Sequence, residues 1–416
     1  MKYVLGYRCS VCDSFYPFKE EMMICPVCKD SGILDLVYDY KNLKKFMRVD
    51  YFKENHEYNI WRYKELLPIR NDFIDNSLRV GWTPLYKSNK VSIKYKVDNL
   101  YFKDEGMNPT QSLKDRASVI GCIKALEANK RVVCCSSTGN AASSLAGNAA
   151  KLGLETVIFV PKRAPIGKLA QLLAFGAKVI KVDGDYKAAY DLSRQAIDKY
   201  GFYNRNAAIN PNLVEGKKTV AYEIWEQLDY QLTDWVIVSV GDGCTIAGVY
   251  KGFFDLKSLG LIEKIPRIMG VQSEGCSPIN DAYHNDLVVR ESVEDTIADS
   301  IAVGIPRNPI KALNAVKNSN GTYLKVSDNE ILEALKELGA LEGIFAEPAA
   351  ACSYAGLIKG RKEEVIKDKE SVTVIITGNG LKDTKNALTI INEPVDLKNN
   401  FQDFIDYMEG ERVINE

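Results

Sequence analysis

From about residue 97 onward, the sequence alternates between short apolar runs of strand length and amphipathic stretches of helix length. This alternation predicts open, mostly parallel β-sheets with helices on both faces. Ligands of such α/β folds bind outside the carboxyl ends of the strands, so the residues that follow each strand carry most information about function. The expected strands are Leu100 to Lys103, Arg131 to Cys135, Thr156 to Val160, Lys178 to Val182, Trp235 to Val240, Arg267 to Val271 and Ser371 to Ile376.

The first ~30 residues differ in kind from the rest. They contain two C-x-x-C pairs, Cys9-Ser10-Val11-Cys12 and Cys25-Pro26-Val27-Cys28, with twelve residues between them. Four thiolates satisfy tetrahedral Zn²⁺, as in a zinc ribbon. The alternative is two disulfides or four free thiols. A reducing compartment disfavours the disulfides. We expect a closed, structural zinc site on Cys9, Cys12, Cys25 and Cys28.

Bulk composition excludes several classes of protein. The 416 residues, of which 46% are hydrophobic and 26% charged, suit a globular protein of about two or three domains. A formal net charge of -1 without a basic stripe argues against a nucleic-acid binder. Met1 to Tyr7 is too weakly apolar for a signal peptide, and no apolar run approaches the ~20 residues of a membrane helix. With ten cysteines that form no disulfide framework, we expect a cytoplasmic protein.

The first unusual strand-to-helix junction is Asn108-Pro109-Thr110-Gln111-Ser112-Leu113-Lys114-Asp115-Arg116. A lysine just inside a helix start lies at the positive end of the helix dipole, which favours its neutral, nucleophilic form. Schiff-base chemistry needs that form. The same residues also fit a surface lysine in a charged helix start, and this junction alone favours that interpretation.

A second junction, Ser136-Ser137-Thr138-Gly139-Asn140-Ala141-Ala142-Ser143, directly follows an expected strand. Small hydroxyl residues and a glycine leave backbone N–H groups free at a helix N-terminus, which is a site for a carboxylate or a phosphate. A helix capped by Ser137 or Asn140 is the alternative.

Two further junctions follow apolar strands. The loop Gly241-Asp242-Gly243-Cys244-Thr245 fits a phosphate but is neither a P-loop nor a dinucleotide fingerprint, and an ordinary glycine turn is the alternative. The carboxylate of Asp242 should point away from such a phosphate. The last junction, Thr377-Gly378-Asn379-Gly380-Leu381-Lys382-Asp383, leaves the hydroxyl of Thr377 free at the end of a strand.

In their order along the chain, these motifs resemble those of the threonine synthase branch of fold-type II pyridoxal-phosphate enzymes. The family's lysine motif, N-P-T-G-S-F-K-D-R, is present with Gln111 for Gly and Leu113 for Phe, and its S-T-G-N motif matches Ser137 to Asn140. The likeness covers most of residues 81 to 390, and the zinc ribbon is an addition found in part of the broader group. Other matching segments are Thr83-Pro84-Leu85, Lys103-Asp104-Glu105, Glu342 to Pro348 and Thr377 to Asp383.

The resemblance implies a pyridoxal phosphate cofactor and a role for each motif. Lys114 would hold the cofactor as a Schiff base and would move protons between carbons of a small amino-acid substrate. Asn140 would bind the cofactor's phenolic oxygen, and the loop Gly241 to Thr245 its phosphate. Thr377 would face the pyridine nitrogen, where a neutral hydroxyl makes the ring a weaker electron sink than a carboxylate would. The substrate carboxylate would bind to Ser137, Thr138 and neighbouring N–H groups.

Three positions near the expected substrate site depart from the family pattern. Ala141 stands where many members have Thr. Asp185 and Asp191 stand where some members have Asn and, six residues later, a cation. In a partly dry site two carboxylates would repel a substrate phosphate, whereas they would suit a neutral or cationic side chain. The cations that could compensate for them are Lys168, Lys187 and Arg194.

Three functions are consistent with these residues. The first is threonine synthase, which eliminates phosphate from O-phosphohomoserine and adds water at Cβ. The second is a paralogue that catalyses β- or γ-elimination, replacement or, with a small partner subunit, thiolytic cleavage of a non-phosphorylated amino acid. The third is a non-catalytic cofactor-binding scaffold whose zinc ribbon docks a partner. The presence of Lys114, Asn140 and Thr377 together disfavours the scaffold.

The resemblance also implies the architecture. We expect a zinc ribbon in residues 1–35, a helical linker in 36–80 and a tail in 394–416. A small lobe, 118–217, would be inserted into a large cofactor-binding lobe formed by 81–117 and 218–393. The active site would lie between the lobes, whose closure would exclude water. Because fold-type II enzymes are commonly dimers, we also expect a homodimer.

Overall fold

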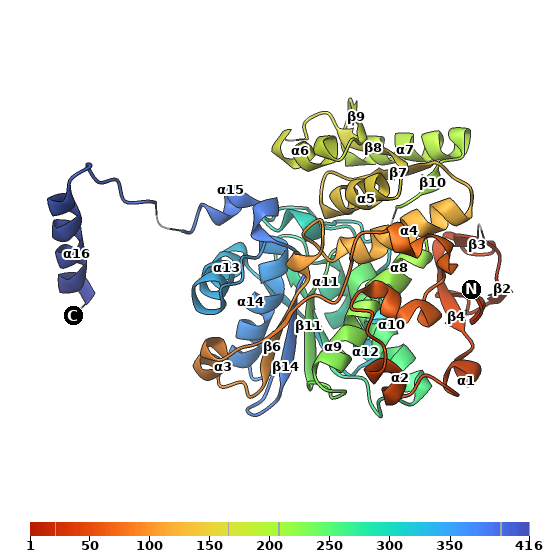
Figure 1. Ribbon diagram of the computed structural model, residues 1–416, viewed down its shortest axis with the longest axis horizontal. Helices are drawn as coiled ribbons and strands as arrows, with labels where there is room; N and C mark the ends of the chain where they lie inside the picture. Colours follow the sequence, from red (N-terminus) through yellow and green to blue (C-terminus); the bar gives the residue numbers. More distant parts are fainter. Residues whose placement is uncertain (21, 165, 207–208, 392, 416) are drawn as a thin grey trace.

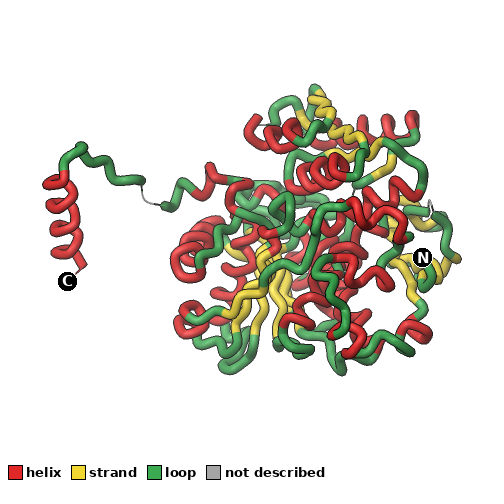
Figure 2. Tube along the Cα trace, in the orientation of Figure 1, coloured by secondary structure: helices red, strands yellow, loops and turns green. Residues whose placement is uncertain are grey.

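The computed structural model describes residues 1–20, 22–164, 166–206, 209–391 and 393–415. It has helices around three sheets, two of them mainly parallel, which confirms the α/β fold class (Figures 1 and 2). Each expected strand is present within two residues of its expected bounds. None of the helices in the described ranges has the length and apolar character needed to cross a membrane.

The smaller parallel sheet has the order β10-β7-β8-β9 and lies at the top of Figure 1. Helix α4 (Lys114–Glu127) leads into it from the larger sheet. Its edge strand β9 is largely exposed to solvent. The elements of this sheet and its helices are β7 (Val132–Ser136), α5 (Asn140–Lys151), β8 (Glu155–Pro161), α6 (Ile166–Ala174), β9 (Lys178–Val182), α7 (Tyr186–Tyr200) and β10 (Tyr203–Asn204).

The larger sheet has the order β13-β12-β11-β14-β6-β5, in which only β5 pairs antiparallel among the described strands. Its strands are β5 (Leu85–Lys87), β6 (Leu100–Asp104), β11 (Trp235–Ser239), β12 (Arg267–Ser273), β13 (Thr322–Val326) and β14 (Val372–Ile376). Its helices are α3 (Lys90–Tyr95), α8 (Asn212–Lys217), α9 (Thr219–Gln227), α10 (Cys244–Leu259), α11 (Pro278–His284), α12 (Pro309–Asn318), α13 (Asp328–Glu342), α14 (Pro348–Lys362) and α15 (Thr384–Ala387), with 3-10 turns η3 (Glu105–Met107), η4 (Asp299–Ile301) and η5 (Gly380–Lys382).

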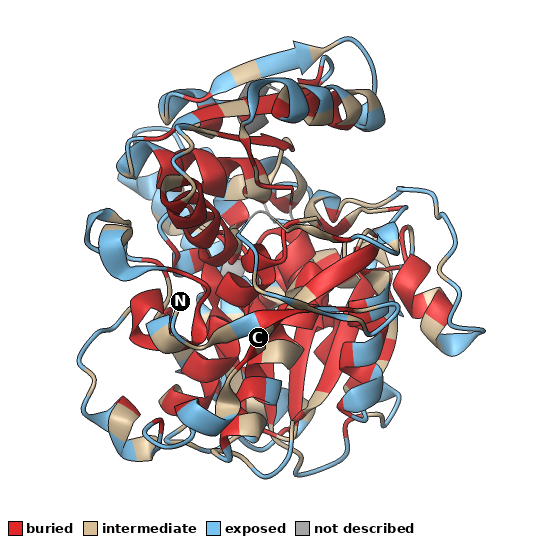
Figure 3. Ribbon diagram, turned by 90° about the vertical axis from the view of Figure 1, so that its right-hand side faces the viewer, coloured by how far each residue is buried: buried red, intermediate tan, exposed pale blue. Residues whose placement is uncertain are grey.

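Strand β11 shows why this sheet is covered on both faces. Val236 and Val238 pack into the core on the side of α9, α10 and α12, whereas Trp235 and Ile237 pack into the core on the side of α13 and α14. Alternate residues of a strand point to opposite faces, so a continuous apolar run is buried on both sides. Figure 3 shows this sheet as the buried centre of the molecule.

The N-terminal residues form a four-stranded antiparallel sheet of order β2-β1-β4-β3. Strand β4 continues to Tyr38, past the end expected for the ribbon at residue 35. The strands are β1 (Val4–Cys9), β2 (Phe15–Pro17), β3 (Ile24–Cys25) and β4 (Lys29–Tyr38), and the segments after them are α1 (Tyr40–Leu43), α2 (Val49–Lys53), η1 (Ile60–Leu66) and η2 (Asn71–Asn76).

The ribbon is packed firmly against the body of the protein. The hydroxyl of Tyr38 donates to Glu215 of α8 at 2.9 Å. Lys251 of α10 donates to the carbonyl of Leu36 at 2.8 Å, and Lys311 of α12 donates to the carbonyl of Leu34 at 2.7 Å. The ribbon therefore braces α8, α10 and α12. At the other end of the chain, α16 (Phe401–Asn415) stands apart from the body in Figure 1.

A fully buried ion network joins the larger sheet to α4 and α9. Arg116 of α4 pairs with Glu105 at 2.6 Å and with Glu223 of α9 at 2.5 Å, and Lys103 of β6 pairs with Glu223 at 2.7 Å. Burial alone would raise the pKa of Glu223, but Arg116 and Lys103 hold it at about 2. Every charge in this network thus has a partner, which is the condition for burying charges without a large loss of stability.

Replacing Arg116 by Met should lower the free energy of unfolding by roughly 3–5 kcal/mol, because Glu105 becomes an uncompensated buried charge and Glu223 keeps only Lys103 as a partner. Urea unfolding followed by circular dichroism measures this. The matched control is Arg290→Ala, which breaks the exposed pair with Asp286 and should cost less than about 1 kcal/mol. Equal stability of the two variants would contradict the structural role of the network.

Candidate active site

The lysine motif and the Thr377 motif meet at the carboxyl edge of the larger sheet. The backbone N–H of Leu113 donates to the carbonyl of Thr377 at 2.9 Å, and that of Asn379 donates to the carbonyl of Gln111 at 3.1 Å. Thr377 directly follows β14, and its hydroxyl lies 3.4 Å from that of Ser239 at the end of β11. Two segments far apart in the sequence are thus fixed beside each other.

Lys114 is the first residue of α4. Burial lowers the pKa of its amine, Glu347 opposes this effect, and Arg205 adds to it. No hydrogen bond or ion pair joins the amine to any residue in the described part of the chain. The sequence predicted a depressed pKa from the helix dipole, and burial lowers the pKa in the same direction. The arrangement favours an uncharged amine, which is a competent nucleophile and base.

Two helices with glycine as their N-cap begin near this region. Helix α5 has Gly139 as its N-cap and α10 has Gly243, and neither start is capped by a side chain. The expected alternative, a cap from Ser137 or Asn140, is therefore wrong: the Ser137 hydroxyl accepts from Gly139 N, and the Asn140 amide donates to Glu347 at 2.7 Å. Free N–H groups and the helix dipole make both starts suited to anions.

The loop before α10 requires glycine at position 243. Its φ is +88°, and a Cβ there would lie 2.5 Å from the carbonyl oxygen of Asn308. Asp242 accepts from the backbone N–H of Arg307 at 3.2 Å, so its carboxylate is directed to the 307 segment rather than to the start of α10. This is the orientation that the sequence predicted for an anion-binding loop. Cys244 and Thr245 form the first turn of α10.

Arg205 and Lys217 are buried cations near this loop that sequence reasoning missed. Arg205 donates to the Ser118 hydroxyl at 2.9 Å, and burial lowers the pKa of Lys217 to about 8. Within the described ranges, neither residue forms an ion pair with a carboxylate. Their electrostatic neighbours include Lys114, Cys244 and Asp242, so positive charge accumulates around the loop. No local pattern in the sequence marks either residue.

Several buried polar atoms near these loops lack a hydrogen-bond partner among the described residues. They include the hydroxyls of Ser112 and Ser136 and the side-chain oxygen of Asn308. Buried polar groups normally have partners. Unpaired cations, two free helix starts and unsatisfied polar atoms together fit an anionic, polar cofactor such as the one that the motifs imply.

A cavity of about 240 Å³ lies beside the start of α5. Of the residues expected at the substrate, Thr138 lines it together with Asn140, whereas Ser137 and Ala141 are not among its described lining residues. Its wall consists of Gln111, Thr138, Gly139, Asn140, Ser143, Ala170, Gln171, Ile297, Asp299, Ser300, Glu347, Pro348, Ala349, Leu381, Lys382 and Asp383. Both lobes expected from the sequence contribute to it.

Asp185 and Asp191 lie outside the described wall of this cavity, and both carboxylates have other partners. Asp185 caps α7 by accepting from Ala188 N at 2.9 Å. Asp191 pairs with Lys187 at 2.7 Å on a solvent-exposed face. Of the cations expected to compensate, Lys187 is thus Asp191's partner, and the side chain of Lys168 lies outside the described residues. The expected repulsion of a substrate phosphate by these two carboxylates therefore has no direct geometric support.

The four cysteines of the ribbon converge. Their sulfur atoms, on Cys9, Cys12, Cys25 and Cys28, all lie within 4.8 Å of one another. Gly32 permits this approach, because a Cβ at that position would lie 2.5 Å from the Cβ of Cys25. Such a set of four thiols is compatible with tetrahedral zinc.

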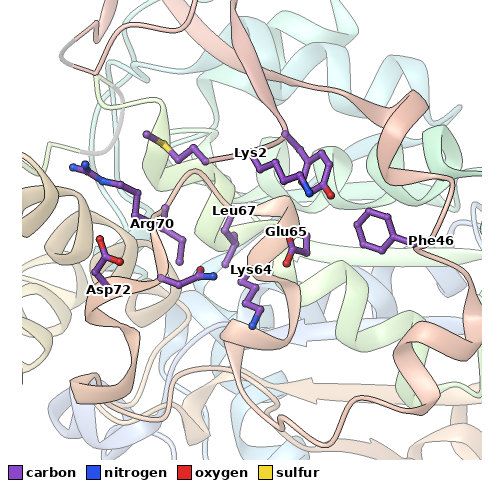
Figure 4. A pocket seen from close by; sticks show the side chains of 11 residues that line it. Lys2, Phe46, Lys64, Glu65, Leu67, Arg70 and Asp72 are labelled. Atoms are coloured by element: carbon purple, nitrogen blue, oxygen red, sulfur yellow. The ribbon is translucent and has the colours of Figure 1, made fainter.

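A larger hollow, of about 550 Å³, lies elsewhere, between the N-terminal residues and the 64–72 segment (Figure 4). Lys2, Phe46, Lys64 and Arg70 are among the side chains that line it. It contains none of the residues at the strand ends. Size alone therefore does not identify the active site.

Comparison with known proteins agrees with this geometry. The family model described as pyridoxal-phosphate dependent enzyme matches residues 77–378. The threonine synthase of Methanocaldococcus jannaschii is 39% identical over 94% of this chain and 96% of its own, and that of Methanosarcina acetivorans is 39% identical over 93% and 94%.

Solved structures are similar at the level of the fold. Diaminopropionate ammonia lyase from Escherichia coli has a TM-score of 0.66 at 19% identity, covering 81% of this chain and 93% of its own. Threonine deaminase isoform 2 from Solanum lycopersicum has a TM-score of 0.62 at 23% identity, covering 74% and 86%.

The lysine motif stores backbone strain at Gln111. Its φ is +67°, in the left-handed region that favours glycine, and the motif that the sequence resembles has Gly at this position. A non-glycine residue in this conformation costs roughly 1–2 kcal/mol. The strain is localised where the loop turns toward Lys114.

Replacing Gln111 by Gly should therefore raise the free energy of unfolding by about 0.5–1 kcal/mol, after the greater freedom of glycine in the unfolded chain offsets part of the gain. Urea denaturation measures the change. Lys96→Gly is the matched control, because Lys96 has a φ of +52° at the exposed end of α3. A stability loss only at position 111 would show that contacts of the Gln111 side chain outweigh the strain.

Proposed function

The chain belongs to the pyridoxal-phosphate dependent enzymes as a homologue of threonine synthases, and from this premise we propose that it is itself a threonine synthase. The resemblance inferred from the motifs is confirmed, as is the fold-type II architecture. The proposed reaction converts O-phosphohomoserine and water to threonine and phosphate. Near full-length identity of 39% to curated threonine synthases is the observation that carries the proposal.

In this proposal, pyridoxal phosphate supplies an electron sink for carbanion chemistry on the substrate amino acid. Lys114 anchors the cofactor and afterwards accepts and returns protons at the substrate carbons. Burial lowers its pKa, which favours the uncharged amine that can act as a base. No histidine or carboxylate needs to take that role.

The proposed binding roles divide between the two helix starts. The start of α10, from Gly241 to Thr245, would hold the cofactor phosphate, with Arg205 and Lys217 adding positive charge behind it. The start of α5, with Ser137 and Thr138, would hold the substrate carboxylate. Each group is anionic, and each would meet free N–H groups at the positive end of a helix.

Asn140 and Thr377 would contact the cofactor ring. Asn140 donates to Glu347 at 2.7 Å and, at a longer 3.5 Å, to the Ser300 hydroxyl, so the plane of its amide is fixed and the weaker of these two bonds would be exchanged for one to the phenolic oxygen. Thr377 would face the pyridine nitrogen. The neutral hydroxyl of Ser239 lies beside it, and such neutral hydroxyls would hold a proton on that nitrogen less firmly than a carboxylate would.

A paralogous elimination or replacement on a non-phosphorylated amino acid is the second candidate. It is favoured by Ala141, which stands where many threonine synthases have Thr. Asp185 and Asp191 give it less support than the sequence suggested, because one caps a helix and the other has a surface ion pair.

We further propose zinc on the four ribbon cysteines and the division into a ribbon, a linker, two lobes and a tail described above. A homodimer is also proposed, in keeping with the exposed apolar side chains of Phe401, Phe404 and Met408 on α16. All ten cysteines are free, which supports the proposal of a reducing, cytoplasmic location.

The test of function mixes the cofactor-loaded protein with O-phosphohomoserine and measures phosphate and threonine. Equimolar release is expected, and Lys114→Ala should reduce the rate by at least roughly 10²–10⁴-fold, because anchor and base are lost together. Lys151→Ala, at an exposed lysine of α5, is the control. A protein that shows the visible absorbance of bound cofactor but releases no phosphate would contradict threonine synthase and favour the paralogue.

Removing zinc with a chelator should release about one metal ion per chain and lower the melting temperature by roughly 10 °C, since a few kcal/mol is lost in a chain of this size. Because the ribbon braces α8 and α10, cofactor retention should weaken as well. Cys12→Ser should reproduce these effects. Cys276→Ser, at a buried thiol outside the cluster, should keep its metal, and a metal-free wild type of full stability would refute the zinc site.

A further inference from the structure

Lys382 stands out among the residues that line the cavity beside α5. It ends η5, in the loop that follows β14, and is the one cation among the described lining residues. Its ammonium donates to the Ser143 hydroxyl of α5 at 3.1 Å and to the side-chain carbonyl of Gln171 in α6 at 2.5 Å. A positive charge from the larger sheet's edge thus reaches across the cavity to the helices of the smaller sheet.

Both of these acceptors are neutral. Within the described ranges, Lys382 forms no ion pair, whereas the buried Lys311 and Lys124 pair with Asp35 and Glu127 at 2.6 Å. Burial lowers the pKa of Lys382, and Glu347 and Asp115 only partly oppose this. A half-buried ammonium without a counter-ion is costly, and an anion that enters the cavity would remove that cost.

The other charged residues in the described cavity wall are carboxylates, so Lys382 is the group in that wall that can attract an anion. Asp383 is engaged with α15, where it accepts from the Asn386 amide at 2.8 Å. Glu347 accepts from Asn140, and burial raises its pKa, which favours its neutral form. Asp299 also lines the wall, and it has a partner of its own. Without Lys382 the described wall would offer no cation to a dianion.

We propose that Lys382 binds the phosphate group of the substrate. The inference rests on the proposed function and adds Lys382 to the compensating cations that the sequence offered, which were Lys168, Lys187 and Arg194. Thr138 and Asn140 line the same cavity at the start of α5, so one ligand can place its carboxylate there and its phosphate at Lys382. The volume of about 240 Å³ suits a small amino acid, since drug-sized ligands occupy roughly 300–1,000 Å³.

The Ser143 hydroxyl would become a second donor to the bound phosphate. At present it contacts both the Asn140 carbonyl and the Lys382 ammonium, at 3.4 and 3.1 Å. A phosphate oxygen would replace the Gln171 carbonyl as an acceptor for Lys382, exchanging a neutral acceptor for a charged one. Charge-assisted hydrogen bonds of this kind are about twice as strong as neutral ones.

The experiment compares cofactor-loaded wild type with Lys382→Ala, Lys382→Arg and Lys385→Ala. Lys385 lies on α15 outside the described cavity wall and is the matched control. Three quantities are measured: kcat and KM for O-phosphohomoserine, the inhibition constant of inorganic phosphate, and the dissociation constant of homoserine, read from the visible absorbance of the bound cofactor. Homoserine has the same carbon chain without the phosphate.

Loss of the ammonium should raise KM and the phosphate inhibition constant by about 10- to 100-fold in Lys382→Ala. Its homoserine dissociation constant should stay within about twofold, which a merely structural defect would not allow. Lys382→Arg should recover most of the phosphate affinity, because it keeps the charge. Lys385→Ala should behave as wild type.

The outcomes separate this inference from the proposed function. If wild type does not process O-phosphohomoserine but binds inorganic phosphate in a Lys382-dependent way, the site stands and the proposed substrate falls. If Lys382→Ala binds O-phosphohomoserine and inorganic phosphate as wild type does, the inference is overturned while threonine synthase activity can stand. Equal weakening of homoserine and phosphate binding would also overturn it, since that result indicates a general loss of structure.

Discussion

The buried guanidinium of Arg116 is the interaction on which the geometry of the site depends. It lies between Glu105 and Glu223, and Lys103 completes the charge balance. These residues belong to β6, η3, α4 and α9, so the network locks the start of α4 against the larger sheet. Lys114 is two residues before Arg116 on the same helical turn. The network therefore fixes the helical turn that carries Lys114.

The same network shows how much of the site could be predicted. The motifs Lys103-Asp104-Glu105 and Lys114-Asp115-Arg116 indicate the family, but they do not separate chemical from structural residues. Asp115 accepts from Thr110 and Asn148 and so holds the lysine loop, and burial raises its pKa to about 6. The loops that follow strands were predicted well, because their position at a strand end follows from the order of elements along the chain. Strands β5, β10 and β13 were not predicted, since they are short or lie at sheet edges where apolar patterning is weak.

The sequence did not indicate the residues whose importance comes from tertiary contacts. Lys217, Arg205 and Lys382 stand in segments without a local signal, and only the fold shows that they form no ion pair with a carboxylate within the described residues. The reverse error concerns Asp185 and Asp191. Their spacing in the family motif predicted a place at the substrate. In the structure, Asp185 caps a helix and Asp191 forms an i,i+4 ion pair with Lys187.

The structure also shows a packing role of the ribbon that its cysteine spacing does not predict. Leu34, Leu36 and Tyr38 are buried in the core shared with α9 and α10, so this face of the ribbon is occupied within the chain. Val11 and Val27, in the two C-x-x-C turns, remain exposed, so a partner would have to meet the ribbon at surfaces of this kind. The helices that it braces include α8, which ends at Lys217, and α10, which begins at the glycine loop. A glycine N-cap such as Gly243 gives up only about a few tenths of a kcal/mol relative to a capping side chain, and support from the ribbon helps α10 to keep its N–H groups free for an anion.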